Sequence, residues 1–339
     1  MKPSAIISGI SGQDGAYLAQ FLLKKNFKVH GILRNKSINN LHRLEFLKIK
    51  NKINLIKQDL FNQSKINKIL KKIRPNLFFN LASESFITYD NPIYTNQINN
   101  HAVINILEAI RNFSKKTKFY QASSSEMFGL NKLNQKILNE NSYFNPVSPY
   151  AIAKLASYNY VRMYRNSFNI FASNGILFNH ESPLRGEKFA SKKIVKALTE
   201  IKYKKKKNSL KLGNIYSKRN WGHAEDYVKV MYKILNYHKP DDFIISSEKK
   251  YSIKEFINKV CTKLNMSIKW SGKGLKEKAL YKDRIIIEIS KKFLRPIDTD
   301  FPIGDSSKAK KKLRWNANNN IDKLIDDMVM FEINNLHAR

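Results

Sequence analysis

The apolar positions in the first half of the chain alternate between short continuous runs and helical spacing. Short apolar runs predict buried β-strands, whereas apolar residues three or four positions apart predict amphipathic helices. The expected strands cover residues 5–8, 27–33, 53–57, 77–82 and 118–122. The expected helices lie around residues 17–23, 41–49, 64–73 and 94–113. This alternation predicts a doubly wound, Rossmann-like parallel sheet with helices on both faces.

The second half of the chain continues the alternation and then becomes less regular. A helix is expected to begin at Pro149, because proline is well suited to a first helical position. A strand at 170–178 is expected to follow it. Further helices are expected at 188–201, 224–236, 253–264 and 321–333. Residues 265–310 are expected to form a loop-rich segment. A strand at 243–247 is expected to rejoin the sheet. We therefore predict a dinucleotide-binding domain over 1–180, rejoined by 223–247, and a smaller interleaved α/β substrate domain over 181–222 and 248–339.

The charge and the cysteine content narrow the class of protein. The 339 residues carry a formal net charge of +35, which is compatible with nucleic-acid binding. The lysines are scattered, however, and accompany heavy use of asparagine and isoleucine, which favours a genome-wide compositional bias over a nucleic-acid surface. A positive field also suits an anionic nucleotide substrate. No apolar run is long enough to cross a membrane, and the single cysteine, Cys261, favours the reducing cytoplasm.

Three glycines follow the first expected strand at the spacing of a dinucleotide-binding loop: Gly9, Gly12 and Gly15. Glycine permits the tight turn and the close approach of a pyrophosphate to the helix amino terminus, although a plain strand–helix turn is the alternative. The second strand ends at Arg34 with no carboxylate after it, which favours NADP over NAD unless Arg34 is an incidental surface residue. Asp59 is placed to meet the adenine or to cap a helix.

A catalytic set follows the fifth strand. Tyr150 and Lys154 are four residues apart on one helix face, so that a lysine cation can favour the phenolate. Tyr203 and Lys207 have the same spacing but not the same place in the fold. Ser124 and Glu126 lie at the end of the fifth strand, where ligands bind in such sheets. A carboxylate there suits removal of an acidic carbon-bound proton, with a turn cap as the alternative for Glu126.

Several stretches of the chain resemble the GDP-mannose 4,6-dehydratase family of extended short-chain dehydrogenases/reductases. The most specific is Asn179-His180-Glu181-Ser182-Pro183, followed by Arg185-Gly186-Glu187. Other matching stretches are residues 9–15, 119–123, 148–154, 221–228 and 294–296. The resemblance runs from about residue 4 to residue 316. It implies an NADP-dependent hydro-lyase that acts on a GDP-sugar and assembles as a tetramer.

The resemblance also implies roles for individual residues. Tyr150 takes the proton of the 4-hydroxyl as hydride passes from C4 to NADP, and Glu126 removes the C5 proton before water leaves and hydride returns to C6. Ser124 and Lys154 complete the catalytic set. The implied NADP site is Gly9, Ile10, Ser11, Gly12, Gln13, Asp14, Arg34, Asn35, Lys36, Ser37, Asp59, Leu60, Leu81, Ala82, Ser83, Glu84, Ser85, Tyr94, Lys154, His180 and Arg185. The implied substrate site is Ser85, Ser124, Asn179, Lys193, Arg219, Arg295 and Asp298. The loop at 34–37 is expected to reach a neighbouring subunit's cofactor.

Some positions depart from the family pattern and leave the sugar open. Glu84-Ser85-Phe86 stands where Gln-Ser-His is usual, and Ser124 replaces a threonine. Leu184, Asn220 and Asp298 replace an arginine, an aspartate and a glutamate. The alternatives are therefore the same dehydration of another GDP-sugar such as GDP-heptose, a nucleotide-sugar epimerase or reductase, or a non-catalytic basic nucleic-acid-binding protein. No metal is expected.

Overall fold

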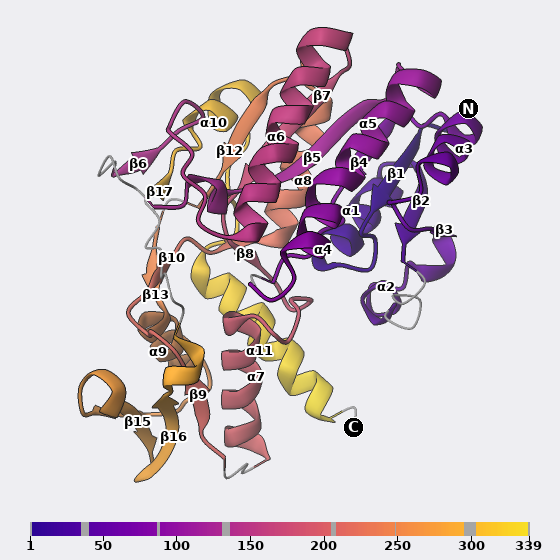
Figure 1. Cartoon of the computed structure of the whole chain (residues 1–339). Coiled ribbons are helices and arrows are strands. Elements are labelled where there is room, and N and C mark those ends of the chain that lie inside the picture. The colour runs from indigo at the N-terminus through magenta and orange to yellow at the C-terminus, as the bar shows by residue number, and fades with distance from the viewer. Residues whose placement is uncertain are drawn as a thin grey trace.

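The computed structural model describes residues 2–34, 41–86, 89–130, 136–204, 208–247, 249–294 and 303–337. Its largest element is a seven-stranded sheet with the strand order β3-β2-β1-β4-β5-β7-β12, in which every neighbouring pair is parallel (Figure 1). The strands are β1 Ser4–Ser8, β2 Lys28–Leu33, β3 Asn54–Lys57, β4 Leu77–Asn80, β5 Lys118–Ser124, β7 Ala172–Leu177 and β12 Asp242–Ile245. The predicted doubly wound sheet is confirmed, including the return of the strand near residue 243.

Alternate strand residues enter two different hydrophobic cores, one on each face of the sheet. Ile7 and Phe79 face the core that contains α1 (Gln13–Lys24) and α8 (Ala224–Leu235). Ile6 and Phe78, one residue earlier in each strand, face the core beneath α3 (Gln63–Ile73), α5 (Ala102–Phe113) and α6 (Pro149–Phe168). Both faces are buried, which is why these strands consist of continuous apolar runs.

The helix predicted over 94–113 is interrupted. It consists of α4 (Pro92–Asn96), a π-helical turn at Gln97–His101, and α5. The π-helical turn places Asn99 toward the loop that follows β4, because its Nδ2 donates to the carbonyls of Thr95 and Glu84. Hydrophobic spacing does not distinguish such a turn from continuous α-helix.

A separate core lies below the sheet in Figure 1 and is built by α7 (Ala190–Tyr203), α9 (Ile253–Lys263) and α11 (Ile321–His337). These helices pack with a mixed sheet of the order β14-β15-β16-β9, comprising Lys269–Ser271, Lys278–Tyr281, Arg284–Ile289 and Leu210–Leu212. The expectation of a loop-rich segment over 265–310 is therefore wrong in part. The β15–β16 hairpin turns at Lys282 and Asp283, which both have positive φ, and this pair lacks the Asn-Gly or Asp-Gly signature of such turns.

Shorter elements connect these units. They are α2 His42–Phe46, β6 Ile137–Leu138, β8 His180–Glu181, β10 Lys218–Arg219, β11 Gly222–His223, β13 Tyr251–Ser252, β17 Ile303–Gly304 and α10 Ser307–Leu313. One-turn 3-10 helices lie at Lys50–Lys52, Ser125–Phe128, Gly274–Lys276 and Lys291–Phe293. Leu313 and Trp315 pack into the core of the large sheet, so the chain returns there before α11 begins. The proposed domain boundaries stay a prediction. No helix in the described ranges is long and apolar enough to span a membrane.

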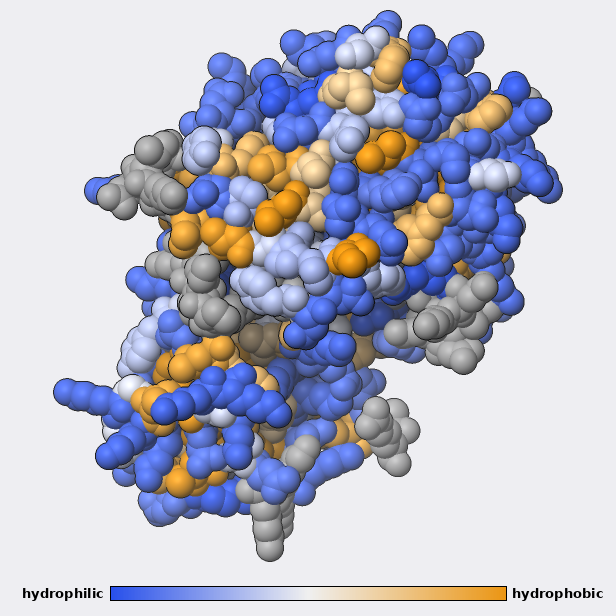
Figure 2. All heavy atoms as spheres, viewed as in Figure 1, coloured by the Kyte–Doolittle hydropathy of each residue, from blue (hydrophilic) through white to orange (hydrophobic). Residues whose placement is uncertain are grey.

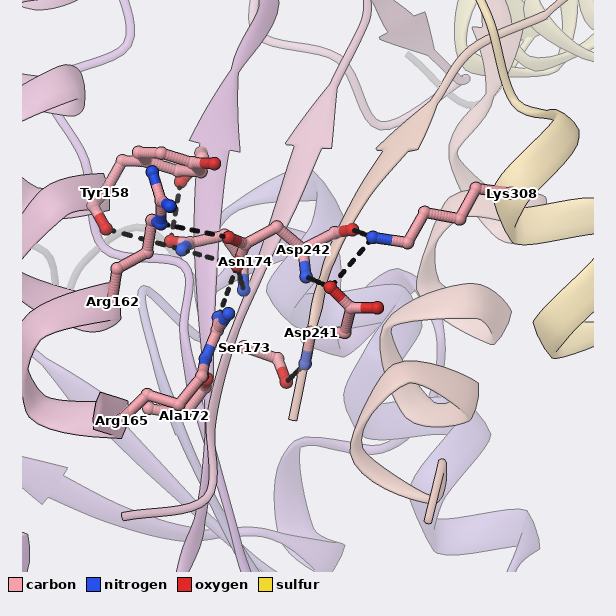
Figure 3. Close-up of polar contacts among 10 residues, drawn as sticks. Tyr158, Arg162, Arg165, Ala172, Ser173, Asn174, Asp241, Asp242 and Lys308 are labelled. Carbon is pink, nitrogen blue, oxygen red and sulfur yellow. Dashed lines mark hydrogen bonds and ion pairs between the residues drawn. The ribbon is translucent and has the colours of Figure 1, made fainter. Parts of the chain in front are cut away.

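The edge strand β12 is fixed to β7 by a buried charge cluster at its amino end (Figure 3). The Asp242 carboxylate accepts hydrogen bonds from the backbone N–H of Asn174 at 3.2 Å and from its side chain at 2.9 Å, and it pairs with the Arg165 guanidinium. Lys308 of α10 donates to the Asp242 carbonyl at 2.7 Å and to Asp241 Oδ1 at 2.8 Å. These contacts bind helix α6, strand β7 and helix α10 to one strand end.

Replacing Asp242 by alanine should therefore destabilise the fold. The change leaves a partly buried guanidinium and two amide donors without their acceptor, which costs about 3–5 kcal/mol of unfolding free energy. The matched control is Asp241→Ala, whose carboxylate is more exposed and should cost less than about 1 kcal/mol. Urea denaturation of the three proteins measures both values, and equal losses in the two variants would contradict the assignment.

Candidate functional site

One large cavity opens beyond the carboxyl ends of the parallel strands, between the large sheet and the α7–α9 core. Its volume is about 550 Å³, and both parts of the chain line it. Twenty predicted site residues share its wall: Gly9, Ser11, Gly12, Gln13, Asp14, Arg34, Leu60, Leu81, Ala82, Ser83, Ser85, Ser124, Glu126, Tyr150, Lys154, Asn179, His180, Arg185, Lys193 and Arg219. The structure thus brings together residues that lie up to 210 positions apart, from Gly9 to Arg219.

The remaining predicted residues lie elsewhere or outside the described ranges. Ile10 is fully buried beneath Gly31, Asp59 is exposed, and Glu84 is half-buried with its carbonyl bound by Asn99. The Tyr94 hydroxyl accepts a hydrogen bond from Arg34, so Tyr94 contacts a residue of the cavity wall without lining it. Asn35, Lys36, Ser37, Arg295 and Asp298 lie outside the described residues. The binding roles of all these residues stay predictions.

The glycine loop has the geometry of a phosphate cradle. Gly9 has φ +71°, and a Cβ there would lie 2.8 Å from the backbone of Leu81 and Ala82. A Cβ at Gly15 would lie 2.4 Å from the Gly9 carbonyl. Gly12 is the N-cap of α1 and supplies no side-chain cap, so the first N–H groups of the helix point at the cavity without a side-chain acceptor. Backbone donors at a helix amino terminus suit a diphosphate.

The first turn of α1 is joined to the chain that leaves the sheet at β7. His180 Nε2 lies 2.8 Å from Asp14 Oδ2, and His180 Nδ1 lies 2.9 Å from the Phe178 carbonyl. Ser182 donates to Gln13 at 2.7 Å, and Gln13 donates to Asp14 and to the His180 carbonyl. Burial opposes charge on both partners, but their mutual attraction prevails and lowers the pKa of Asp14 while raising that of His180. Both shifts favour the ionised form of the Asp14–His180 pair.

Arg43 forms a second junction at this place, which the sequence did not reveal. Its guanidinium donates to the Ser11 carbonyl at 3.0 Å and to the Leu184 carbonyl at 2.7 Å. It thereby connects the glycine loop with the segment that carries Arg185. Arg43 belongs to no recognisable motif, and only the folded chain brings it beside both carbonyls.

Helix α6 and the end of β5 position the candidate catalytic groups. Ser148 caps α6 by accepting from the N–H of Ala151 at 3.2 Å, and Pro149 occupies its first turn. Lys154 is buried, and its Nζ donates to the Ala122 carbonyl at 2.8 Å and lies 5.7 Å from the centroid of the Tyr150 ring. The helix therefore presents phenol and amine to the strand end at the spacing expected from the sequence.

Ser124, Ser83 and Glu126 surround the phenol. The hydroxyls of Ser124 and Ser83 act on the Tyr150 phenol by lowering its pKa, whereas the charge of Glu126 raises it. Glu126 lies in the 3-10 turn directly after β5. The backbone N–H of Glu126 donates to Ser124 Oγ at 3.2 Å. Ser83 in turn donates to Asn99 Oδ1 at 2.6 Å. Asn99 is fully buried and was missed by the sequence analysis, because only the π-helical turn brings it to this loop.

Burial shifts the pKa values of Tyr150 and Lys154 in the directions that disfavour charge. It raises the pKa of Tyr150 to about 12, with a further rise from Glu126 and opposing contributions from the serine hydroxyls. It lowers the pKa of Lys154 to about 7. The phenol is thus protonated at neutral pH, and a positive charge beside it is needed before it can accept a proton from a substrate.

Part of the cavity wall is cationic and aromatic. Lys193 of α7 donates to the Lys211 carbonyl at 3.0 Å and lies 4.0 Å from the Phe293 ring centroid. Arg219 of β10 and Asn179 lie on the same wall. Lining residues that the sequence analysis missed include Lys188, Phe189, Lys211, Asn214, Trp221 and Phe293. No group of three or more His, Cys, Asp or Glu side chains in the described part of the chain could hold a metal ion.

Sequence comparison identifies the family of this chain. The sequence profile of the family described as GDP-mannose 4,6 dehydratase matches residues 6–328. The GDP-mannose 4,6 dehydratase of Drosophila melanogaster is 39% identical over 97% of this chain and 86% of its own length. This chain belongs to the GDP-mannose 4,6-dehydratase family. The resemblance inferred from residues 179–187 is thus confirmed.

Comparison of structures shows that the fold is shared with more than one chemistry. The dTDP-glucose 4,6-dehydratase of Bacillus anthracis, solved in complex with NAD, superposes with a TM-score of 0.82 at 17% identity, over 99% of this chain and 98% of that one. The UDP-glucose 4-epimerase of Thermotoga maritima gives 0.81 at 15% identity, over 98% and 99%. A dehydratase and an epimerase therefore resemble this chain equally well in fold, and the fold alone does not select the reaction.

The low pKa of Lys154 should make stability depend on pH in a specific direction. The unfolded chain holds this proton up to its ordinary pKa of 10.5, whereas the folded chain loses it near 7. Between these values the unfolded state binds more protons, so the stability of the protein should rise with pH relative to Lys154→Met, by up to about 1.4 kcal/mol per pH unit.

Chemical denaturation of both proteins from pH 6 to pH 10, after removal of bound dinucleotide, measures this difference. All other titrating groups are common to the two chains, so the difference isolates Lys154. A difference that stays constant or falls with increasing pH would show that the buried amine keeps its ordinary pKa.

Proposed function

We propose that this protein dehydrates GDP-mannose to GDP-4-dehydro-6-deoxy-D-mannose and releases one water. Membership of the family and 39% identity to a named GDP-mannose 4,6 dehydratase support this reaction. The observation that carries it within the site is the place of Glu126. Its carboxylate lies on the cavity wall close enough to Tyr150 for its charge to act on the phenol. A redox reaction at C4 alone has no use for this second base.

We infer that the dinucleotide is NADP. The residues fit such a group, because a side chain at Gly9 or Gly15 would collide with the backbone, and because the start of α1 offers free donors. Arg34 lies on the cavity wall at the end of β2, where a guanidinium suits the 2′-phosphate of NADP. Bound NADP would supply a hydride acceptor at C4 and a hydride donor at C6, with no net consumption.

Tyr150 would remove the proton of the 4-hydroxyl while C4 is oxidised. The Ser124 and Ser83 hydroxyls favour ionisation of the phenol, because their contributions lower its pKa. The Lys154 ammonium, 5.7 Å from the ring, favours the phenolate that must form. A pKa of about 7 for Lys154 lets this group exchange a proton near neutral pH.

Glu126 would act once C4 is a ketone, because the neighbouring C5 proton is then acidic. Its carboxylate removes that proton, and the proton leaves with the 6-hydroxyl as water. The C5–H and C6–O bonds break in this step, and a C5–C6 double bond forms. The cations Lys193 and Arg219 line the same cavity, where they would hold the diphosphate of GDP.

The direct test is incubation of the purified protein with GDP-mannose. We expect a product lighter by one water, formed without net consumption of NADP, and we expect denatured protein to release NADP rather than NAD. Turnover of GDP-heptose but not GDP-mannose would move the assignment to the alternative sugar. Retention of all substrate atoms with inversion at C4 would identify an epimerase instead.

The variant Glu126→Gln separates oxidation from elimination. It should lower kcat for dehydration by about 10²–10⁴-fold, the usual contribution of a general base, while leaving the Kd for NADP unchanged. Mass spectrometry of the product and fluorescence titration of NADP measure the two effects. Full dehydration by this variant would exclude Glu126 from the mechanism.

We also propose that the protein is a homo-oligomer, as the family resemblance implies. Figure 2 shows apolar side chains on the face that α6 covers in Figure 1. On α6, Ile152, Tyr160 and Met163 are 56%, 37% and 38% exposed, and Ile93 on the neighbouring α4 is 74% exposed. Apolar side chains grouped in this way on adjacent helices suit burial against a second copy of the chain.

Replacing Ile152 by aspartate should weaken that association, because it would bury a charge in an apolar interface. Light scattering after size-exclusion chromatography should show an oligomer for the parent protein and a smaller species for the variant. The exposed Met330 on α11 provides a control, since Met330→Asp lies on a different surface. A parent protein that elutes as a monomer would refute the proposal.

A further inference from the structure

Four side chains form a continuous stack along one wall of the cavity. The Arg185 guanidinium lies 3.5 Å from the centroid of the Phe189 ring and pairs with Glu181 at 3.0 Å. Phe189 meets Phe86 edge to face, with ring centroids 6.2 Å apart and planes at 82°. Lys188 Nζ lies 5.7 Å from the centroid of Phe86. Phe86, Arg185, Lys188 and Phe189 all line the cavity.

The stack joins two parts of the chain that are remote in sequence. Phe86 follows the β4 loop that carries Ser83, whereas residues 185–189 precede α7. Arg43 fixes the base of the second segment through the Leu184 carbonyl. Phe86 nevertheless remains 42% exposed at the cavity, so its ring is only partly covered by protein. A half-covered aromatic ring on a cavity wall is available to a ligand.

Both ends of the stack are close to the catalytic phenol. Ser83, three residues before Phe86, lines the cavity together with Tyr150 and Arg185, and both Ser83 and the charge of Arg185 act on the phenol. Three residues of chain reach at most about 10 Å. The part of a substrate that lies beside Tyr150 is the ring that carries the reacting 4-hydroxyl. The exposed part of Phe86 is therefore within reach of the sugar rather than confined to the nucleotide end.

We propose that Phe86 determines the sugar specificity of this cavity, with Phe189 and Lys188 holding its ring in place. This inference rests on the proposed dehydration of a GDP-hexose. The ring face of Phe86 would pack against the C–H bonds of the pyranose, and the Lys188 ammonium would donate to a sugar hydroxyl. An aromatic ring excludes water from one side of the sugar without competing for its hydroxyls, so a ring of different hydroxyl pattern or size would fit this wall less well.

Binding measurements with and without the sugar test the proposal. In a Tyr150→Phe background, which prevents turnover, calorimetry gives the Kd of GDP-mannose and of GDP. Adding Phe86→Ala should raise the Kd of GDP-mannose about tenfold, as expected for loss of one aromatic contact, and leave the Kd of GDP within about twofold. Phe86→Tyr should restore most of the affinity, because it keeps the ring.

The matched control is Phe46→Ala. Phe46 is similarly exposed, at 53%, but it packs on Phe331 and does not line the cavity, so both Kd values should be unchanged. Equal weakening of GDP and GDP-mannose by Phe86→Ala would place the ring at the nucleotide and overturn the inference. Unchanged binding of both ligands would overturn it as well. If the parent protein neither binds nor dehydrates GDP-mannose, the proposed function itself fails.

Discussion

The hydrogen bond from Lys154 to the Ala122 carbonyl is the contact on which the site depends. It is 2.8 Å long, it is buried, and it fixes α6 to the end of β5. Because Tyr150 is one helical turn earlier, the same contact places the phenol against Ser124. The burial that makes this junction rigid also lowers the pKa of the amine and raises that of the phenol. Rigidity and chemical reactivity at this site thus have one physical cause.

A second constraint joins the dinucleotide cradle to the substrate wall. The Asp14–His180 contact, and the two carbonyls bound by Arg43, tie α1 and its loop to the segment after β7. That segment carries Arg185 and leads into α7, which bears Lys193. The cavity is therefore not a gap between two independent units. Its two walls are held at a fixed separation by charged and hydrogen-bonded groups at its floor.

The comparison with solved structures separates the scaffold from the reaction. A dehydratase and an epimerase superpose on this chain with nearly equal TM-scores, so the fold is a scaffold common to both reactions. What distinguishes a dehydratase is a base for the C5 proton, and the turn Ser125–Phe128 brings Glu126 to the cavity for that role in our proposal. The Phe86 stack adds a wall to the same cavity without altering the catalytic set.

The sequence by itself determined the sheet, the glycine cradle and the Tyr150–Lys154 pair, because each follows from local periodicity or from spacing within one helix. It also indicated the family through residues 179–187. It did not reveal Asn99, Arg43 or the Phe86–Phe189 contact, nor the β15–β16 hairpin. These features depend on a π-helical turn, on a positive-φ turn without its usual residues, and on segments 100 or more positions apart. Only tertiary packing brings such groups together, because no short-range pattern encodes contacts between remote segments.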